Sequence, residues 1–385
     1  MPFLFIVFLT LLFQIALKGN ILLVSLYGLH LQASPAFLGV IIAAGSLFPM
    51  FLASFVGRLS DRVSLNFLLT IGMIGSGLSL VAIYFLVANL WVLLAIQLLF
   101  GLFQIITVVS SQNLVGALSS EGTRTKNYGA YTLSVSIANF IGPLLVGFVI
   151  DWLDFAVAYL MLGIFALLPG LLFLVIPIKG VAKKEKDTVE NTSFLQLLLH
   201  QKLRSVFITS GVILTGVGLF EFYFPIYTSS IGLSTSVIGV LVGVNALAFI
   251  ISRLLMTPLQ RKFSPEQMIG GCLLIAGCAF FVLPFIKAVP LLAVISFVMG
   301  LGLGCCQPLS IVMAYNASPA GYTGEVLGIR LTVNKAVQFA VPIVFGSMSF
   351  VGFFPIFWLN TVLLGFSGSS LLKWLPNKKN VTKSN

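Results

Sequence analysis

The sequence predicts an all-helical membrane protein, with about twelve transmembrane helices arranged as two related six-helix bundles. The 385 residues are 59% hydrophobic and only 8% charged, and their mean hydropathy is +1.11, whereas a soluble chain is about 25% charged. Apolar runs of about twenty residues recur along the chain, which is the length that crosses a bilayer as a helix. These runs do not alternate in polarity as barrel strands do. The two halves of the chain also repeat one another, as shown below.

The first apolar run, residues 3–27, has no basic segment before it and no small-residue cleavage site after it. We therefore interpret it as a retained span, and the alternative is a cleaved signal peptide. The other runs are long enough to follow as spans joined by short loops, and the last two meet at a turn near Gly352. They cover residues 36–56, 67–87, 90–114, 128–150, 156–176, 205–228, 236–256, 267–287, 290–313, 326–350 and 352–374.

One long polar stretch, residues 179–204, divides these spans into six and six. The sequence therefore predicts an N-terminal bundle over residues 1–178, a central loop over 179–204, and a C-terminal bundle with a short tail over 205–385. All but three of the 21 Lys and Arg residues lie on the side of the central loop; the exceptions are Lys18, Lys287 and Lys335. Because cytoplasmic loops retain basic residues, we expect both termini and the central loop to be cytoplasmic.

The net charge of +11 then reflects this topology and contact with anionic lipid. Nucleic-acid binding would require a soluble basic surface, which the chain does not offer. The four cysteines lie in apolar runs without a C-x-x-C pair or a nearby histidine, so we expect no metal site. The glycine clusters do not follow a strand, and we expect no nucleotide loop and no cofactor.

The internal repeat has an offset of about 199–200 positions. Its matches keep their order along the chain, and they include rare proline and basic-loop positions as well as glycines. Pro143 and Gly147 correspond to Pro342 and Gly346, and Asn139 corresponds to Gln338. Transporters are commonly built from such repeats, with the binding site between them near the middle of the membrane.

The loop after the second span carries a recognisable pattern, Gly57-Arg58-Leu59-Ser60-Asp61-Arg62. It resembles the G-x-L-x-D-R-x-G-R signature of the major facilitator superfamily, although Ser64 and Asn66 depart from its second part. The resemblance implies a bacterial inner-membrane secondary transporter that works by alternating access. It also implies that Gly57, Asp61 and Arg62 belong to a cytoplasmic latch between the halves. We add Arg253, Glu325 and Arg330 to the expected gating residues because they lie near the cytoplasmic helix ends.

Gly142, Pro143 and Gly147 in the fifth span resemble the family's G-P-x-x-G-G exporter motif, and with Pro342 and Gly346 we expect them to pack helices. This motif favours export. In the fourth span, however, Gln97 stands where the exporter pattern has an arginine, which argues against typical drug–proton antiport. Uptake of a siderophore or another metabolite is therefore the alternative direction.

Charged groups within spans are costly in lipid and are functional candidates by default. Lys18, Glu221 and Lys335 are the charges that the sequence places deep in spans. In the family, the first, fourth, seventh and tenth helices line the cavity, so Lys18 and Glu221 would lie on equivalent helices. We expect Glu221 to couple transport to protons and Lys18 with Lys335 to bind an anionic part of the substrate. The alternative is a structural ion pair between Glu221 and either lysine.

Polar amides within spans are further candidates for substrate binding, although they could equally join helices. The predicted substrate-binding set is Gln14, Lys18, Gln97, Gln104, Gln307, Lys335 and Gln338. These features favour a proton-coupled transporter of a small organic solute that acts as a monomer. The sequence offers no converging catalytic set, so we expect no enzyme activity. The alternative from another class is a transport-inactive membrane sensor or scaffold.

Overall fold

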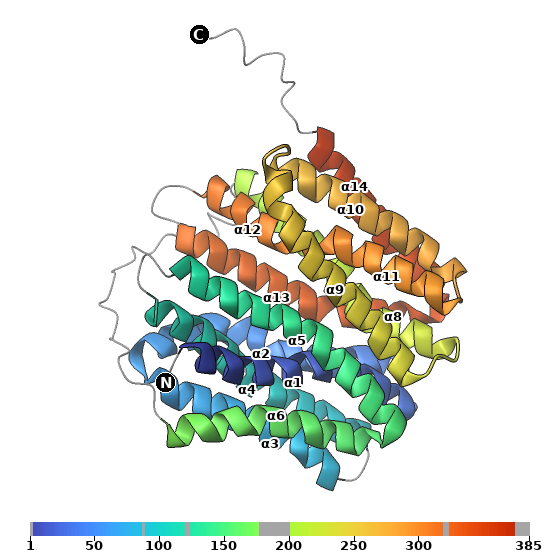
Figure 1. Ribbon diagram of the computed structural model, residues 1–385. Coiled ribbons are helices and arrows are strands. Elements are labelled where there is room, and N and C mark those ends of the chain that lie inside the picture. Colours follow the sequence, from blue (N-terminus) through green and yellow to red (C-terminus); the bar gives the residue numbers. More distant parts are fainter. Residues whose placement is uncertain (1–2, 87–88, 120–123, 177–200, 319–322, 374–385) are drawn as a thin grey trace, which may run out of the picture.

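The computed structural model describes residues 3–86, 89–119, 124–176, 201–318 and 323–373, and it is all-helical (Figure 1). Within these residues, twelve helical segments are long and apolar enough to cross a membrane. The predicted fold class is confirmed. Residues 177–200, which contain most of the predicted central loop, lie outside the described part.

The N-terminal half contains six helices: α1 (Phe3–His30), α2 (Pro35–Arg62), α3 (Leu65–Phe85), α4 (Leu90–Ala117), α5 (Arg124–Trp152) and α6 (Phe155–Val175). The C-terminal half contains α8 (Gln201–Ser230), α9 (Thr235–Gln260), α10 (Pro265–Val282), η1 (Leu283–Phe285), α11 (Val289–Gly304), α12 (Cys306–Ala317), α13 (Thr323–Ser347), η2 (Met348–Val351) and α14 (Phe353–Lys373). The tenth span, predicted as one helix over 290–313, is divided into α11 and α12 at Cys305.

Several helices begin at side-chain caps that satisfy otherwise unpaired backbone N–H groups. Asn89 accepts from the N–H of Trp91 at 2.8 Å, and Asp154 accepts from the N–H of Val157 at 2.7 Å. Ser264 and Gln267 form a reciprocal capping box at the start of α10, as such a Ser-x-x-Gln pattern predicts.

The repeat is visible in the backbone of two turns. Between α1 and α2, the N–H groups of residues 31, 32 and 33 bond to the carbonyls of residues 27, 29 and 28. Between α8 and α9, residues 231, 232 and 233 bond to residues 227, 229 and 228 in the same pattern, about 200 positions later. Gln32 and Gly232 occupy the same left-handed position, with φ of 61° and 85°.

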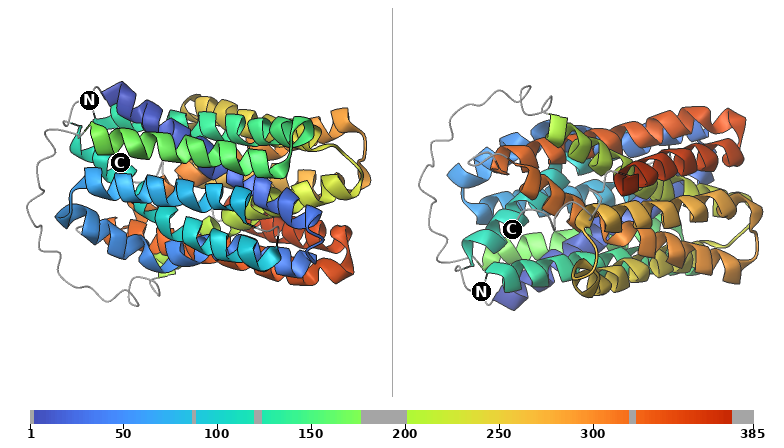
Figure 2. Two further views of the ribbon diagram at one scale, coloured as in Figure 1. Left: turned by 90° about the horizontal axis from the view of Figure 1, so that it is seen from below. Right: turned by 90° about the horizontal axis from the view of Figure 1, so that it is seen from above.

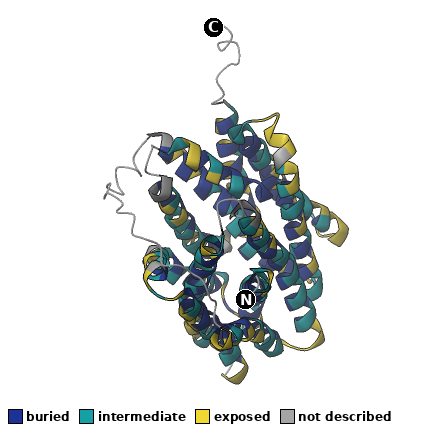
Figure 3. Ribbon diagram, turned by 60° about the vertical axis from the view of Figure 1, so that its left-hand side comes forward, coloured by how far each residue is buried: buried dark blue, intermediate teal, exposed yellow. Residues whose placement is uncertain are grey.

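Helix packing repeats in the same way. α3 packs on α6, α2 on α4 and α1 on α5, while in the other half α10 packs on α14, α9 on α11 and α8 on α13. Figure 2 shows the helices lying roughly parallel along the molecule. Each half has its own hydrophobic core, and buried residues concentrate between the helices of each half (Figure 3). Many large apolar side chains point outward, as expected for surfaces in contact with lipid.

The two halves meet along two helix pairs. We call the contact of α5 with α9 the first seam and that of α2 with α13 the second seam. We also call the side where α1 begins the terminal side, and the opposite side the far side. Both seams are tightest near the far side, where glycines of one half face backbone of the other.

Glycine is required at these crossings because a side chain would enter the facing backbone. In the first seam, a Cβ on Gly147 would lie 2.5 Å from the carbonyl oxygen of Thr235, and one on Gly239 would lie 2.6 Å from that of Pro143. In the second seam, a Cβ on Gly346 would lie 2.7 Å from the carbonyl oxygen of Pro35. Gly39 faces the carbonyl of Pro342. Small residues thus permit the close approach of the halves.

Candidate functional site

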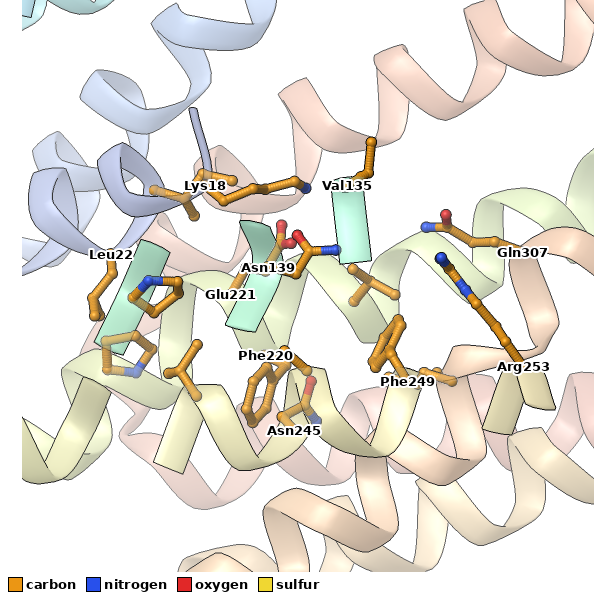
Figure 4. A pocket seen from close by; sticks show the side chains of 17 residues that line it. Lys18, Leu22, Val135, Asn139, Phe220, Glu221, Asn245, Phe249, Arg253 and Gln307 are labelled. Carbon is orange, nitrogen blue, oxygen red and sulfur yellow. The ribbon is translucent and has the colours of Figure 1, made fainter. Parts of the chain in front are cut away.

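A cavity of about 150 Å³ lies between the two halves (Figure 4). Six helices line it: α1 and α5 from the N-terminal half, and α8, α9, α11 and α12 from the C-terminal half. The lining residues are Lys18, Ile21, Leu22, Val135, Asn139, Pro143, Val217, Phe220, Glu221, Pro225, Val242, Asn245, Ala246, Phe249, Arg253, Leu303 and Gln307. The wall is therefore mostly apolar, with a few polar groups, as is usual for a small-molecule site.

The helices around the cavity differ in part from those expected. The first, seventh and tenth spans contribute lining residues, but among the described residues the fourth span, α4, contributes none, and α5 and α9 do. The reason is local packing: α4 lies against α2 and α3. Gly101 of α4 approaches the backbone of Gly45 so closely that a Cβ would lie 2.6 Å from its carbonyl oxygen.

One end of the cavity brings together Lys18, Glu221 and Asn139, which come from α1, α8 and α5. Their polar groups point toward a common space in Figure 4. Among the described residues, no hydrogen bond or ion pair engages the carboxylate of Glu221 or the ammonium of Lys18. Lys335 of α13 lies within electrostatic range of both. The carboxylate of Glu221 therefore has no direct ion-pair partner among the described residues.

The other end of the cavity holds Arg253 of α9 and the side chain of Gln307 of α12. Nη1 of Arg253 donates to Oγ of Ser136 on α5 at 2.6 Å, so this side chain joins the two halves. Arg330 supports the same end, since its Nη2 donates to the backbone oxygen of Gln307 at 3.2 Å and to Oγ of Ser310. Arg330 is only 4% exposed, whereas the sequence placed it near a helix end.

The remaining predicted substrate-binding residues lie outside the cavity lining. The buried amides of Gln97 and Asn20 bond reciprocally at 3.1 and 3.3 Å, joining α4 to α1. Gln104 donates to the carbonyl of Gly45 at 2.8 Å. Gln14 donates to the hydroxyl of Tyr131 at 3.2 Å. Lys335 donates to Gln338 at 2.9 Å along α13. Three of these four predicted glutamines, Gln14, Gln97 and Gln104, thus join neighbouring helices, and Gln338 bonds within α13.

The expected latch lies at the terminal-side end of α2. Arg62 is exposed there, and a Cβ on Gly57 would meet no atom within 4 Å. The same open space surrounds Gly129 and Gly328 near the terminal-side ends of α5 and α13. The side chains of Asp61 and Glu325 lie outside the described part, so their gating roles stay predictions.

Two polar contributors to the cavity were absent from the predicted site residues, whereas Arg253, a third, was predicted only as a gating residue. Asn139 was identified only as the repeat partner of Gln338, and Asn245 was not included in the site. Asn245 lines the cavity and donates to the carbonyl of Ser296 at 2.8 Å. Its position eight residues before Arg253, on the same face of α9, is the signal that could have identified it.

Gly142 packs α5 onto α1, since a Cβ there would lie 2.8 Å from the backbone nitrogen of Gly19.

The described residues contain no group of three or more His, Cys, Asp or Glu side chains arranged to hold a metal ion. Among the described residues, the cavity lining combines one carboxylate, two cationic side chains and three amides with a mostly apolar wall.

Comparison with known proteins gives consistent matches. The family model described as Major Facilitator Superfamily matches residues 4–342 and 206–385. The Quinolone resistance protein NorA of Staphylococcus aureus is 25% identical over 321 residues, covering 81% of this chain and 80% of NorA. The Uncharacterized MFS-type transporter YqjV of Bacillus subtilis (strain 168) is 21% identical over 276 residues, covering 70% of this chain and 67% of YqjV.

Solved structures share the fold. A peptide transporter POT variant in complex with sulfate superposes with a TM-score of 0.81 at 15% identity, covering 96% of this chain and 93% of that one. A variant of the nucleoside transporter NupG gives a TM-score of 0.80 at 14% identity, covering 96% and 99%. At these identities, the likeness extends to the fold alone.

Proposed function

The chain belongs to the major facilitator superfamily and is a secondary transporter and not an enzyme; from this premise we propose that it exports a small organic solute by alternating access, with a proton on Glu221 as the coupled ion. The observation that carries the proposal is the cavity between the halves, in which Glu221 has no direct ion-pair partner among the described residues. A carboxyl group that gains and loses a proton there changes the charge of the binding site.

Export is favoured by two features. NorA, a quinolone resistance protein, aligns with four fifths of this chain, and the Gly142-Pro143 pair that resembles the exporter motif lies against α1 and the cavity. Uptake remains the second candidate direction, because Gln97 replaces the arginine of the exporter pattern and its amide pairs with Asn20.

We further propose that the terminal side is cytoplasmic. The basic ends of α2 and α9, with Arg58, Arg62, Arg261 and Lys262, lie on that side, as expected for cytoplasmic helix ends. The tight far-side crossings then support a conformation that is closed to the outside.

The first test compares small metabolites inside and outside cells with and without the protein. Export predicts compounds that accumulate inside cells lacking the protein and outside cells that produce it, and uptake predicts the reverse. Compounds identified in this way are then followed in proteoliposomes with an imposed pH gradient. Absence of flux for every such compound would support a sensor or scaffold instead.

The second test addresses the coupling ion. Glu221→Gln should abolish acceleration of flux by the pH gradient while leaving exchange of the compound across the membrane. Glu266→Gln is the matched control, because Glu266 lies in the first turn of α10 and outside the cavity lining. Undiminished proton-driven flux in Glu221→Gln would reject the coupling role.

A further inference from the structure

The cavity has an excess of positive charge. Among the described residues, Glu221 is the single carboxylate in its lining, while Lys18 and Arg253 both line it. Lys335 lies within electrostatic range of Lys18 and Glu221, and Arg330 bonds to the backbone of Gln307. Isolated charges in a low-dielectric site are costly unless they have a counter-charge, so the site is incomplete without additional negative charge.

The uncompensated charge is concentrated at the end formed by Arg253 and Gln307. Arg253 has only a neutral partner, Ser136, and its buried Nε has no partner among the described residues. Arg330 is also buried, at 4% exposed, and its Nε likewise has no hydrogen-bond partner among the described residues. Guanidinium groups bind oxyanions with paired N–H donors, and the side-chain amide of Gln307 adds a further donor on the same space.

Between the two polar ends the wall is apolar. Phe220 and Phe249 line it together with Val242 and Leu303. Figure 4 shows the ring of Phe249 between Glu221 and Arg253, and the ring of Phe220 on the Glu221 side next to Asn245. Such a wall favours a molecule with an apolar body next to its charged group.

We propose that the transported molecule is an organic anion, held with its carboxylate or another oxyanion group on Arg253 and Gln307 and with its apolar part against Phe220 and Phe249. This inference rests on the proposed function, because it assigns the substrate class of the same cavity. It differs from the sequence-based expectation, which assigned the anionic group to Lys18 and Lys335 at the opposite end.

The same charges determine the sign of the coupling. Ionised Glu221 repels a second anion in the cavity. It also offsets the charge of Lys18, which lines the cavity, and that of Lys335, which lies within electrostatic range. A proton on Glu221 removes both effects, so the proton and the organic anion bind cooperatively. By linkage, the bound anion strengthens proton binding by the same factor. The proton and the anion are therefore carried in the same direction, and an outward gradient of the anion can drive its export.

The first experiment measures the potential of the cavity without requiring the natural substrate. Val135 lines the cavity, and Val135→Cys is made in a background where the four native cysteines are replaced. An anionic and a cationic methanethiosulfonate reagent are compared, each rate being divided by that for a free thiol in the same buffer. We expect the normalised rate of the anionic reagent to be about tenfold higher than that of the cationic one. One uncompensated positive charge at roughly 10 Å accounts for a preference of this size.

Arg253→Gln should reduce that preference severalfold, whereas Arg261→Gln, at the exposed end of α9, should leave it unchanged. A preference for the cationic reagent, or equal normalised rates, would overturn the proposal. This measurement needs neither flux nor a pH gradient, so a failure of the proposed transport function leaves its outcome interpretable.

The second experiment uses matched probes on the purified full chain in nanodiscs. Aliphatic and aromatic monocarboxylates and dicarboxylates of three to ten carbons are each compared with the corresponding amide and amine by thermal shift and by calorimetry. We expect carboxylates to bind at least tenfold more tightly than their amides, with affinity rising as the pH is lowered toward protonation of Glu221.

In Arg253→Gln the preference for carboxylate over amide should disappear, and Arg253→Lys should restore part of it; folding of both variants is checked by their melting temperatures. In Glu221→Gln the carboxylates should bind tightly at every pH. If amides or amines bind better, or if no carboxylate in the panel binds, the substrate class is not an organic anion.

Discussion

The two seams between the halves are built from equivalent helices but carry different side chains. Both bring glycines onto the opposing backbone near the far side. Among the described residues, the first seam alone carries a carboxylate cap. The carboxylate of Asp151 on α5 accepts from the N–H groups of Thr235 at 3.1 Å and Ser236 at 2.8 Å, and from the Thr235 hydroxyl, at the start of α9.

The first seam also carries the Arg253–Ser136 hydrogen bond, and its helices α5 and α9 contribute much of the cavity lining. Among the described residues, no side-chain hydrogen bond joins α2 to α13, and these helices contribute nothing to the lining. The repeat thus gives both seams the same close approach of backbones. The side chains differ, because those of the first seam also reach the cavity and those of the second seam do not.

The largest effect should come from substitutions that break what the two seams share. Gly239→Val and Gly39→Val each place a branched side chain against a backbone carbonyl of the other half. We call the conformation in which the halves meet at the far side the far-closed state. The added side chain should raise the free energy of this state by about 3 kcal/mol through overpacking, which lowers its population by roughly a hundredfold. Transport should be abolished in both variants. Spin labels at Leu153 and Ala288 would report the far-side distance between the halves.

Gly271→Val is the control for these variants, because a Cβ at Gly271 meets no atom within 4 Å. If Gly39→Val transported normally while Gly239→Val did not, the two crossings would not be equivalent.

A smaller effect should separate the seams. Asp151→Asn keeps the shape of the cap but removes the charge that strengthens its hydrogen bonds. Hydrogen bonds to a charged group contribute about 1.5–3 kcal/mol each when they are buried and less at this exposed position. We therefore expect the population of the far-closed state to fall about tenfold. The same pair of spin labels measures it, with Asp154→Asn, which caps α6 within one half, as the control. An unchanged distance distribution would show that the cap does not hold the seam.

Ser136→Ala tests the second link of the first seam. It removes the neutral acceptor of Arg253, at a cost of about 1 kcal/mol, and should alter the transport rate about fivefold without affecting the second seam. Ser134→Ala is the matched control, because the Ser134 hydroxyl bonds within its own helix. Equal rates in the two variants would contradict a role for Arg253 in joining the halves.

The smallest effect should come from giving the second seam what it lacks. Phe350, about 199 positions after Asp151, is 86% exposed and lies in η2, which contacts α2. Phe350→Asp would place a carboxylate at the position that the repeat matches to Asp151, near the start of α2, where such charges contribute about 0.3–1 kcal/mol. We expect a modest increase in the far-closed population, and partial rescue of Asp151→Asn in the double variant. No rescue would show that the seams differ in backbone as well as in side chains.

The sequence predicted the spans well because their signal is additive over about twenty residues. The second span was expected over 36–56 and the helix α2 runs over Pro35–Arg62, the difference being a polar end that hydropathy does not detect. The repeat was also predictable, since prolines and glycines occupy positions where few other residues fit.

The cavity was less predictable, and Gln97 and Gln104 show why. Polar residues recur on one face of α4. Such a face can be oriented toward a cavity or toward a neighbouring helix, because either one supplies hydrogen-bond partners. These two amides bond to Asn20 and Gly45. Glu221 and Lys18 were easier to predict, because a charge has fewer stable alternatives within a span.

The interruption of the tenth span at Cys305 has a mechanical consequence. The N–H of Cys305 bonds to the carbonyl of Leu303, which breaks the regular helical ladder between α11 and α12. Leu303 and Gln307, on opposite sides of this elbow, both touch the cavity. A molecule bound between them would contact the span on both sides of this interruption, where the irregular hydrogen bond makes the helix easier to bend.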